Sequence, residues 1–261
     1  MSDMEIEVRP TEFLSDGETI RGHFVKPKGK GPFPSVCKFH GLPGGADQTS
    51  GVATQLAEVG FAVLTFDFRG FRSSEGMFSL AGEIVDGQNA ITHLLESDFA
   101  KESWTGVVAA SYGGAVAVCT AAIDSRVSAV CLRAPVYDTL WFAKSPMIPM
   151  AVENLLATDP KCVHGLKDPD IRANVLERMV TDAEKHNPMN EIEKIAPRPL
   201  LIVHGSDDVG IDLAGIKRLY ELAGEPKDLV VVEGADHELT DPRAFDITMK
   251  TIVSWFESQR T

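Results

Sequence analysis

The chain of 261 residues contains 44% hydrophobic and 24% charged residues and has a formal net charge of −13. Its length and ordinary composition suit a soluble globular protein with one large α/β domain or two small ones. Lys and Arg form no cluster, so neither nucleic acid nor an anionic membrane surface is expected as a partner.

The start of the chain and the cysteines bear on the cellular compartment. Met1–Glu7 has neither the basic nor the apolar part of a signal peptide. Of the four cysteines, Cys37, Cys119 and Cys131 lie in apolar runs, and no C-x-x-C pair is present. This pattern favours buried thiols in a reducing compartment over disulfides or metal ligands, and we expect a cytoplasmic protein without a metal.

Strands and helices are expected to alternate along most of the chain. Ile6–Leu14 and Thr19–Val25 alternate in polarity and predict a hairpin. The later apolar runs predict strands at Ser35–Phe39, Phe61–Phe66, Gly106–Ala110, Val127–Leu132, Pro199–Val203 and Leu229–Val232. Helical periodicity is found at Gln48–Val59, Leu80–Leu95, Gly113–Ile123, Leu213–Leu222 and Pro242–Phe256. The order predicts an α/β fold, a mostly parallel central sheet with helices on both faces.

One uncharged segment, Ser103–Ile123, is long enough to span a bilayer. Its first half is β-branched, its second half is rich in alanine, and Ser-Tyr-Gly-Gly lies between them. A buried strand followed by a buried helix accounts for this pattern better than a membrane span does.

Residues 137–196 interrupt the alternation, because they have helical, charged and proline-containing sequence without a strand pattern. This predicts a core domain at 1–136 and 197–261 and a helical cap or lid at 137–196. A helical decoration of one sheet edge is the alternative. The candidate pocket-lining residues are Trp141, Phe142, Met147, Ile148 and Met150, although packing of the insertion on the core would require the same side chains.

Ser111 lies where a β-branched run changes abruptly into a small-residue helix. A sharp strand–turn–helix with serine at its tip is typical of a nucleophile elbow. The tight turn requires small residues two positions before and two after the serine, and these are Ala109 and Gly113. An ordinary buried helix start is the alternative.

The ends of two later strands supply the groups that a serine nucleophile needs. Asp208 follows the predicted strand ending at Val203, and His237 follows the one ending at Val232. Because functional groups gather at the carboxyl edge of a parallel sheet, we expect Ser111, His237 and Asp208 to meet as nucleophile, base and orienting carboxylate. Asp207 is the alternative carboxylate.

Acyl transfer also requires two N–H donors for the oxyanion. The backbone N–H of Tyr112 is one candidate. The other comes from the loop His40–Gly45, where Pro43 has no N–H, so Leu42 is the expected donor. A plain strand-to-helix turn is the alternative for this loop. His40 and His204 each precede a glycine at a strand end and are expected to hold nearby loop backbone.

These motifs, in this order, resemble the α/β-hydrolase superfamily from the first hairpin to the last helix. The matching segments are His40-Gly41, Asp67-x-Arg69-Gly70, the Ser111 elbow, Pro199–Asp208 and Gly234–His237. Arg72 stands where the D-x-R-G-x-G-x-S loop usually has glycine, and we assign the loop Phe66–Gly76 a structural role beneath the cleft. The resemblance is nearest to capped serine carboxylesterases and to the serine aminopeptidase-like or dienelactone hydrolase-like group.

The resemblance implies a serine hydrolase, a carboxylesterase of small to medium acyl esters that needs no cofactor. A thioesterase, an aminopeptidase or amidase, and a lactone or C–C bond hydrolase would share the triad. A non-enzymatic binding scaffold is the alternative of a different class. The sequence leaves a homodimer open.

Overall fold

The computed structural model describes residues 4–44 and 48–260, so Met1–Asp3 and Gly45 of the predictions above lie outside the described residues. Eight strands form one sheet in the order β1-β2-β4-β3-β5-β6-β7-β8. Their bounds are β1 Ile6–Ser15, β2 Glu18–Pro27, β3 Phe33–Phe39, β4 Ala62–Phe66, β5 Ala100–Ala110, β6 Ala129–Arg133, β7 Leu200–Gly205 and β8 Lys227–Val232. The pairs β1–β2 and β2–β4 are antiparallel and the others are parallel, which confirms the predicted fold class.

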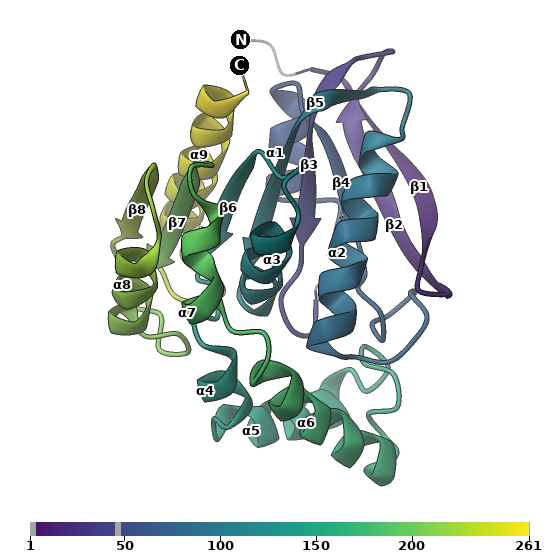
Figure 1. Ribbon diagram of the computed structural model, residues 1–261, viewed down its shortest axis with the longest axis vertical. Coiled ribbons are helices and arrows are strands. Elements are labelled where there is room, and N and C mark those ends of the chain that lie inside the picture. Colours follow the sequence, from purple (N-terminus) through teal and green to yellow (C-terminus); the bar gives the residue numbers. More distant parts are fainter. Residues whose placement is uncertain (1–3, 45–47, 261) are drawn as a thin grey trace.

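Helices cover both faces of this sheet (Figure 1). The apolar faces of α2 (Leu80–Leu95), α3 (Tyr112–Ile123) and α8 (Leu213–Leu222) share one buried cluster, and those of α1 (Val52–Glu58) and α9 (Pro242–Gln259) share another. The strands between them are therefore buried on both sides, as their near-continuous apolar sequence predicts.

Several predicted boundaries differ from the structure by a few residues, and three of these differences are the following. The strand β5 begins at Ala100, earlier than Gly106, because Ala100 pairs with Phe33 of β3. A register shift separates this pair from the rest of the ladder, and no β-branched pattern in the sequence predicts the extension. The strand β7 extends past Val203 to Gly205. The helix α1 begins at Val52, later than Gln48, because Gly51 at its N-cap has a positive φ of 63°.

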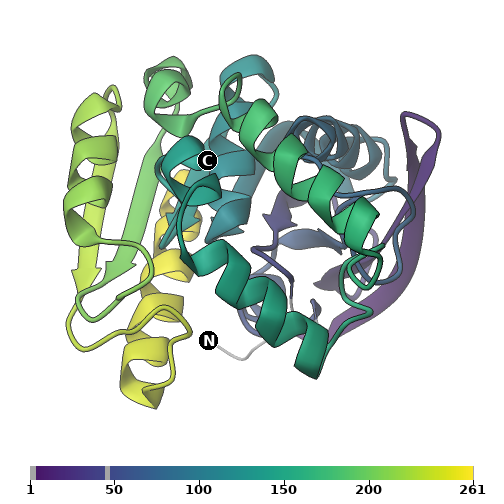
Figure 2. The same ribbon diagram turned by 90° about the horizontal axis from the view of Figure 1, so that it is seen from below.

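The segment between β6 and β7 consists of helices, the first three of which lie beyond the carboxyl ends of the strands (Figure 1 and Figure 2). They are α4 (Thr139–Ala143), α5 (Met147–Thr158), α6 (Pro169–Ala183), α7 (Pro188–Glu191) and the 3₁₀ helix η1 (Ile192–Ile195). Both α7 and η1 pack against α3 of the core. Polar contacts connect the other three helices to the core. For example, the Asp182 carboxylate of α6 accepts the N–H of Ala81 in α2 at 3.2 Å.

In residues 4–44 and 48–260, no helix combines the length and the apolar character that crossing a membrane requires.

Candidate active site

Ser111 lies at the turn between β5 and α3 in a strained backbone conformation, with φ 53° and ψ −125°. Such a conformation persists only where the surroundings enforce it. Here the Ser111 N–H donates to the Arg133 carbonyl at 3.0 Å, and the Val136 N–H donates to the Ser111 carbonyl at 2.9 Å. Ala109 is buried beside Phe39 of β3, so the elbow accommodates its methyl group.

Close backbone packing around this turn explains why glycine follows the serine. A Cβ atom on Gly113 would lie 2.3 Å from the His40 carbonyl oxygen, and one on Gly114 would lie 2.5 Å from the Cβ of Pro135. Both positions therefore exclude a side chain. The start of α3 is pressed against the loop that follows β3.

The structure brings the side chains of Ser111, His237 and Asp208 together. His237 Nε2 lies 3.1 Å from Ser111 Oγ, and His237 Nδ1 lies 2.7 Å from Asp208 Oδ2. Because the carboxylate is only an acceptor, Nδ1 carries the proton and Nε2 accepts from the serine hydroxyl. Asp207 points elsewhere, and its carboxylate accepts the Ser206 hydroxyl at 2.7 Å.

Asp208 is held as a carboxylate by hydrogen bonds to both of its oxygens. Its Oδ1 accepts the N–H groups of Gly210 and Ile211 at 2.9 Å each, while Oδ2 accepts from His237. Burial raises the pKa of Asp208, but these hydrogen bonds outweigh burial and leave the pKa below its usual value. The residue is therefore ionised at neutral pH.

The loop between β8 and α9 presents the His237 ring, which is 24% exposed, to the cavity. The half-buried Arg133, at the end of β6, donates a hydrogen bond from its guanidinium to the His237 carbonyl and so holds this loop in place. Sequence reasoning missed Arg133, although its place at a strand end on the same edge was a usable signal.

The loop after β3 approaches Ser111 closely. A Cβ on Gly41 would lie 2.9 Å from Ser111 Cβ and 3.1 Å from the Ala110 carbonyl oxygen. Leu42 lines the same cavity as Ser111. In the described part of the chain no hydrogen bond uses the N–H of Leu42, and Tyr112, the first residue of α3, has no acceptor within its helix.

His40 braces this loop, as predicted. Its Nδ1 donates to the Gly41 carbonyl at 2.7 Å, and its Nε2 accepts the Phe68 N–H at 3.0 Å. Burial lowers the pKa of His40, which keeps the ring neutral and able to accept at Nε2.

His204 is buried inside the sheet, because β7 continues to Gly205. The backbone of Ile211, in the loop before α8, interacts with its ring, although neither ring nitrogen forms a hydrogen bond of good geometry within the described part of the chain.

The loop between β4 and α2 has polar partners on both sides, which agrees with a structural role. Arg69 pairs with the buried Asp86 of α2 at 2.7 Å. Arg72, with φ 42°, bridges two segments that come from different parts of the chain. Its guanidinium donates to the Gly44 carbonyl at 3.0 Å and to Asp159 Oδ2, just after α5, at 3.2 Å.

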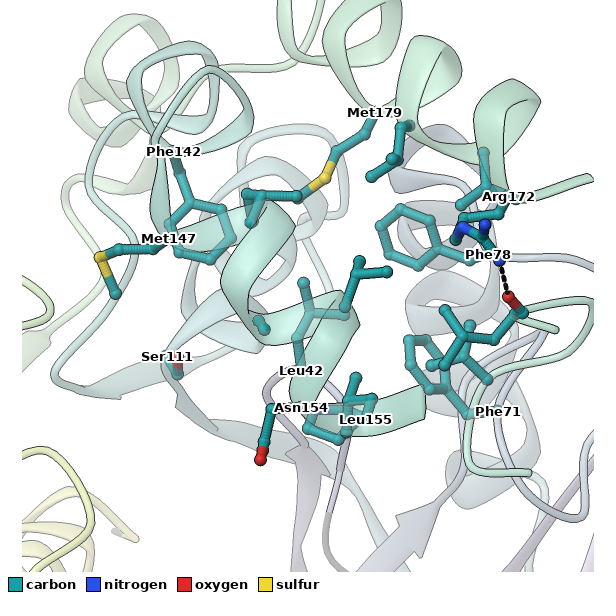
Figure 3. Close-up of a pocket in the computed structure, with 18 of the residues that line it drawn as sticks. Leu42, Phe71, Phe78, Ser111, Phe142, Met147, Asn154, Leu155, Arg172 and Met179 are labelled. Atoms are coloured by element: carbon teal, nitrogen blue, oxygen red, sulfur yellow. Dashed lines mark hydrogen bonds between the residues drawn. The ribbon is translucent and has the colours of Figure 1, made fainter. Parts of the chain in front are cut away.

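A cavity of about 380 Å³ opens beside Ser111, between the core and α4–α6 (Figure 3). Phe142, Met147 and Ile148 line it, as predicted. Trp141 and Met150 do not, and for these two the prediction is wrong. Trp141 stacks on Tyr137 with ring centroids 5.0 Å apart, and the side chain of Met150 is 68% exposed to solvent.

Sequence reasoning also missed most of the cavity wall. The face of α6 that carries Arg172, Val175, Leu176 and Met179 lines the cavity with helical spacing. That spacing is visible in the sequence for the three apolar residues and would have identified them.

A metal site is not evident in the described residues, where no three His, Cys, Asp or Glu side chains are grouped to hold an ion.

Comparison with known proteins adds to this geometry. Residues 31–242 match the model of the family described as serine aminopeptidase, S33. The uncharacterized protein YfhR of Escherichia coli O157:H7 is 25% identical over 231 residues, which cover 85% of this chain and 70% of YfhR.

Two solved structures share the fold. The α/β hydrolase GrgF from Penicillium sp. superposes with a TM-score of 0.74 at 20% identity, covering 97% of this chain and 99% of GrgF. The esterase PF2001 of Pyrococcus furiosus gives a TM-score of 0.71 at 16% identity, covering 98% and 92%. Since the family model spans most of the chain and the fold agrees, the protein belongs to the serine aminopeptidase S33 family within the α/β-hydrolase superfamily of enzymes.

Proposed function

We propose that the protein is a serine carboxylesterase that cleaves small to medium acyl esters. The observation that carries this proposal is the unbroken hydrogen-bond chain Asp208–His237–Ser111, which ends at the wall of the cavity. A serine hydroxyl becomes a competent nucleophile when a neutral imidazole accepts its proton and a carboxylate fixes the imidazole tautomer.

In this mechanism His237 Nε2 takes the proton of Ser111 as Oγ attacks the acyl carbonyl. The negative charge that develops on the carbonyl oxygen is stabilised by the N–H groups of Leu42 and Tyr112. Each donor contributes roughly 2.7–4 kcal/mol to lowering the barrier. His237 then protonates the leaving alcohol, and a water molecule, deprotonated by His237, releases the acid from Ser111.

The walls of the cavity favour an ester with an apolar acyl or alcohol part over a peptide amine. An aminopeptidase substrate carries an ammonium group, which a pair of carboxylates near the cleft would bind. Glu153 and Glu177, the candidates in the insertion, do not line the cavity, and Glu238 is the single carboxylate among the described residues that does, so no pair is present there. The S33 family name therefore does not decide the substrate.

Hydrolysis of p-nitrophenyl esters from acetate to dodecanoate tests the proposal. We expect turnover by the wild type, and loss of nearly all turnover in Ser111→Ala and His237→Ala with the melting temperature retained. A fluorophosphonate probe should label the wild type but not Ser111→Ala. Full activity of folded His237→Ala would refute the assignment.

A further inference from the structure

Among the described residues that line the cavity beside Ser111, Arg172 is a cation that the proposed hydrolysis does not use. Arg172, in the first turns of α6, lines the cavity together with mainly apolar side chains. Figure 3 places Arg172 and Ser111 at opposite ends of the cavity, with Leu42, Leu155, Phe71 and Phe78 between them.

The guanidinium of Arg172 is half-buried and forms no ion pair among residues 4–44 and 48–260. Its recorded side-chain hydrogen bond is from Nη1 to the Leu166 carbonyl at 2.7 Å. A guanidinium has five N–H donors in a planar fork, so donors remain for a second partner. A charge beside apolar walls is costly unless it is paired, and the missing partner would have to be an anion.

The other polar groups of the wall do not supply that partner. The ring nitrogens of His164 lie 3.1 Å from the Gly76 carbonyl and 3.2 Å from the Arg72 carbonyl. Glu238 also lines the cavity, but it follows His237 and so lies at the serine end. The cavity thus has an anion next to the nucleophile and a cation at the far end.

We infer that Arg172 recognises an anionic group at the end of the substrate remote from the scissile bond. The substrate class is an ester whose apolar chain spans the cavity and ends in a carboxylate or another oxyanion. An arginine fork binds such groups with two parallel hydrogen bonds, whereas Glu238 disfavours an anion close to the reacting carbonyl. This inference rests on the proposed esterase function and adds the substrate class to it.

The test compares esters that differ only in the remote charge. p-Nitrophenyl hydrogen suberate has a free terminal carboxylate, and p-nitrophenyl methyl suberate has the same chain with that carboxylate capped. A second pair, the acetate esters of an ω-hydroxy fatty acid and of its methyl ester, places the charge on the alcohol side. We expect the wild type to prefer the charged member of at least one pair by about tenfold or more in kcat/KM, the usual effect of a hydrogen bond to a charged group.

Arg172→Gln should abolish this preference. Its kcat/KM for the capped ester should stay within about threefold of the wild-type value, since the contacts of that ester with the cavity remain. Arg172→Lys should retain part of the preference because the charge remains. Arg178→Gln is the matched control, since Arg178 is exposed on the same helix and does not line the cavity. Equal rates of the wild type on both members of each pair would overturn the inference. An equal loss of kcat/KM for the charged and the capped ester in folded Arg172→Gln would also overturn the inference.

Chain length provides a second readout that needs no variant. A hydrogen succinate ester places its carboxylate among the apolar side chains before it reaches Arg172, so it should be a poorer substrate than the uncharged butyrate. The order should reverse as the diacid lengthens to suberate or sebacate. The absence of any reversal would count against recognition at the far end.

Failure of the esterase proposal is distinguishable from failure of this inference. If the wild type hydrolyses none of these esters, the proposed function falls. Calorimetric titration of Ser111→Ala with monomethyl suberate and dimethyl suberate then decides the second question. The anion site is supported if Ser111→Ala binds the monoacid more tightly than the diester and if this difference disappears in the double variant that also carries Arg172→Gln. Equal binding of both compounds by Ser111→Ala overturns it.

Discussion

The approach of the β3 loop to the nucleophile makes Gly41→Ala an informative perturbation. The added Cβ would lie 2.9 Å from Ser111 Cβ, 3.1 Å from the Ala110 carbonyl oxygen and 3.5 Å from Ser111 Oγ. The first two atoms belong to the elbow and cannot rotate away. Gly41 is not among the glycines with positive φ, so alanine fits its backbone conformation and the effect is purely steric.

The loop has to retreat by several tenths of an ångström, and Leu42 moves with it. Loss of one oxyanion donor costs about 100-fold to 1,000-fold in kcat. A misplacement near 1 Å has about a 100-fold effect, so we expect kcat to fall about 100-fold. Overpacking typically costs about 1–3 kcal/mol, so the variant should still fold. The assay is kcat and KM on a p-nitrophenyl ester that the wild type turns over, together with the melting temperature.

Gly210→Ala is the matched control on the other side of the cavity. A Cβ there would meet Met147 Cε at 3.4 Å and Asp208 Oδ1 at 3.5 Å, which are ordinary contacts, and the backbone N–H to Asp208 remains. Its activity should stay within a few-fold of wild type. Wild-type kcat in Gly41→Ala, or an equal loss in both variants, would refute the argument that this loop supplies a positioned donor.

Three further predictions concern the residues around the nucleophile. Asp208→Asn should lower kcat by less than Ser111→Ala does, because the oxyanion donors and the imidazole remain, and ester kinetics of the two variants check this order. Arg72→Gly should leave the melting temperature nearly unchanged, since an ion pair worth at most about 1 kcal/mol is exchanged for relief of a left-handed residue costing about 1–2 kcal/mol. Its kcat/KM should nevertheless fall several-fold, because Gly44 and Asp159 are no longer joined. The pKa of His40 is lowered in the folded state, so the unfolded chain binds more protons and stability should fall as pH drops below about 6.5. Melting temperatures between mildly acidic and neutral pH should show a shallower slope in His40→Gln, and an unchanged slope would contradict this assignment.

The sheet and the meeting of Ser111, His237 and Asp208 were predictable because they depend on local patterns at successive strand ends. Each apolar run ends at a turn with a polar residue, and parallel strands bring those turns to one edge. Which carboxylate meets His237 was less determined, since Asp207 and Asp208 are adjacent. The structure distinguishes them by the N–H groups of residues 210 and 211, which donate to the carboxylate of Asp208.

The cavity was harder to predict because it depends on which helix faces meet across the insertion. Composition identified apolar residues near the start of the insertion but not the direction of their side chains. Met147 and Met150 were therefore treated alike, although Met147 lines the cavity and Met150 is exposed to solvent. Arg172 was missed because nothing local distinguishes it from Arg178 on the same helix. Their difference arises only when α6 packs over the strand ends.

The catalytic geometry and the choice of substrate therefore depend on two different parts of the molecule. Ser111, His237 and Asp208 follow three parallel strands whose positions are fixed by the sheet, and Arg133 at a fourth strand end holds the histidine loop. Much of the cavity wall comes instead from α4–α6, which polar contacts tie to the core at points such as Ala81. A change at Arg172 alters a wall that touches none of the reacting atoms, so substrate choice can change while the bond-breaking geometry stays constant. On this reasoning, the Arg172 variants should change the ranking of substrates while their rate of labelling by a small fluorophosphonate stays at the wild-type value.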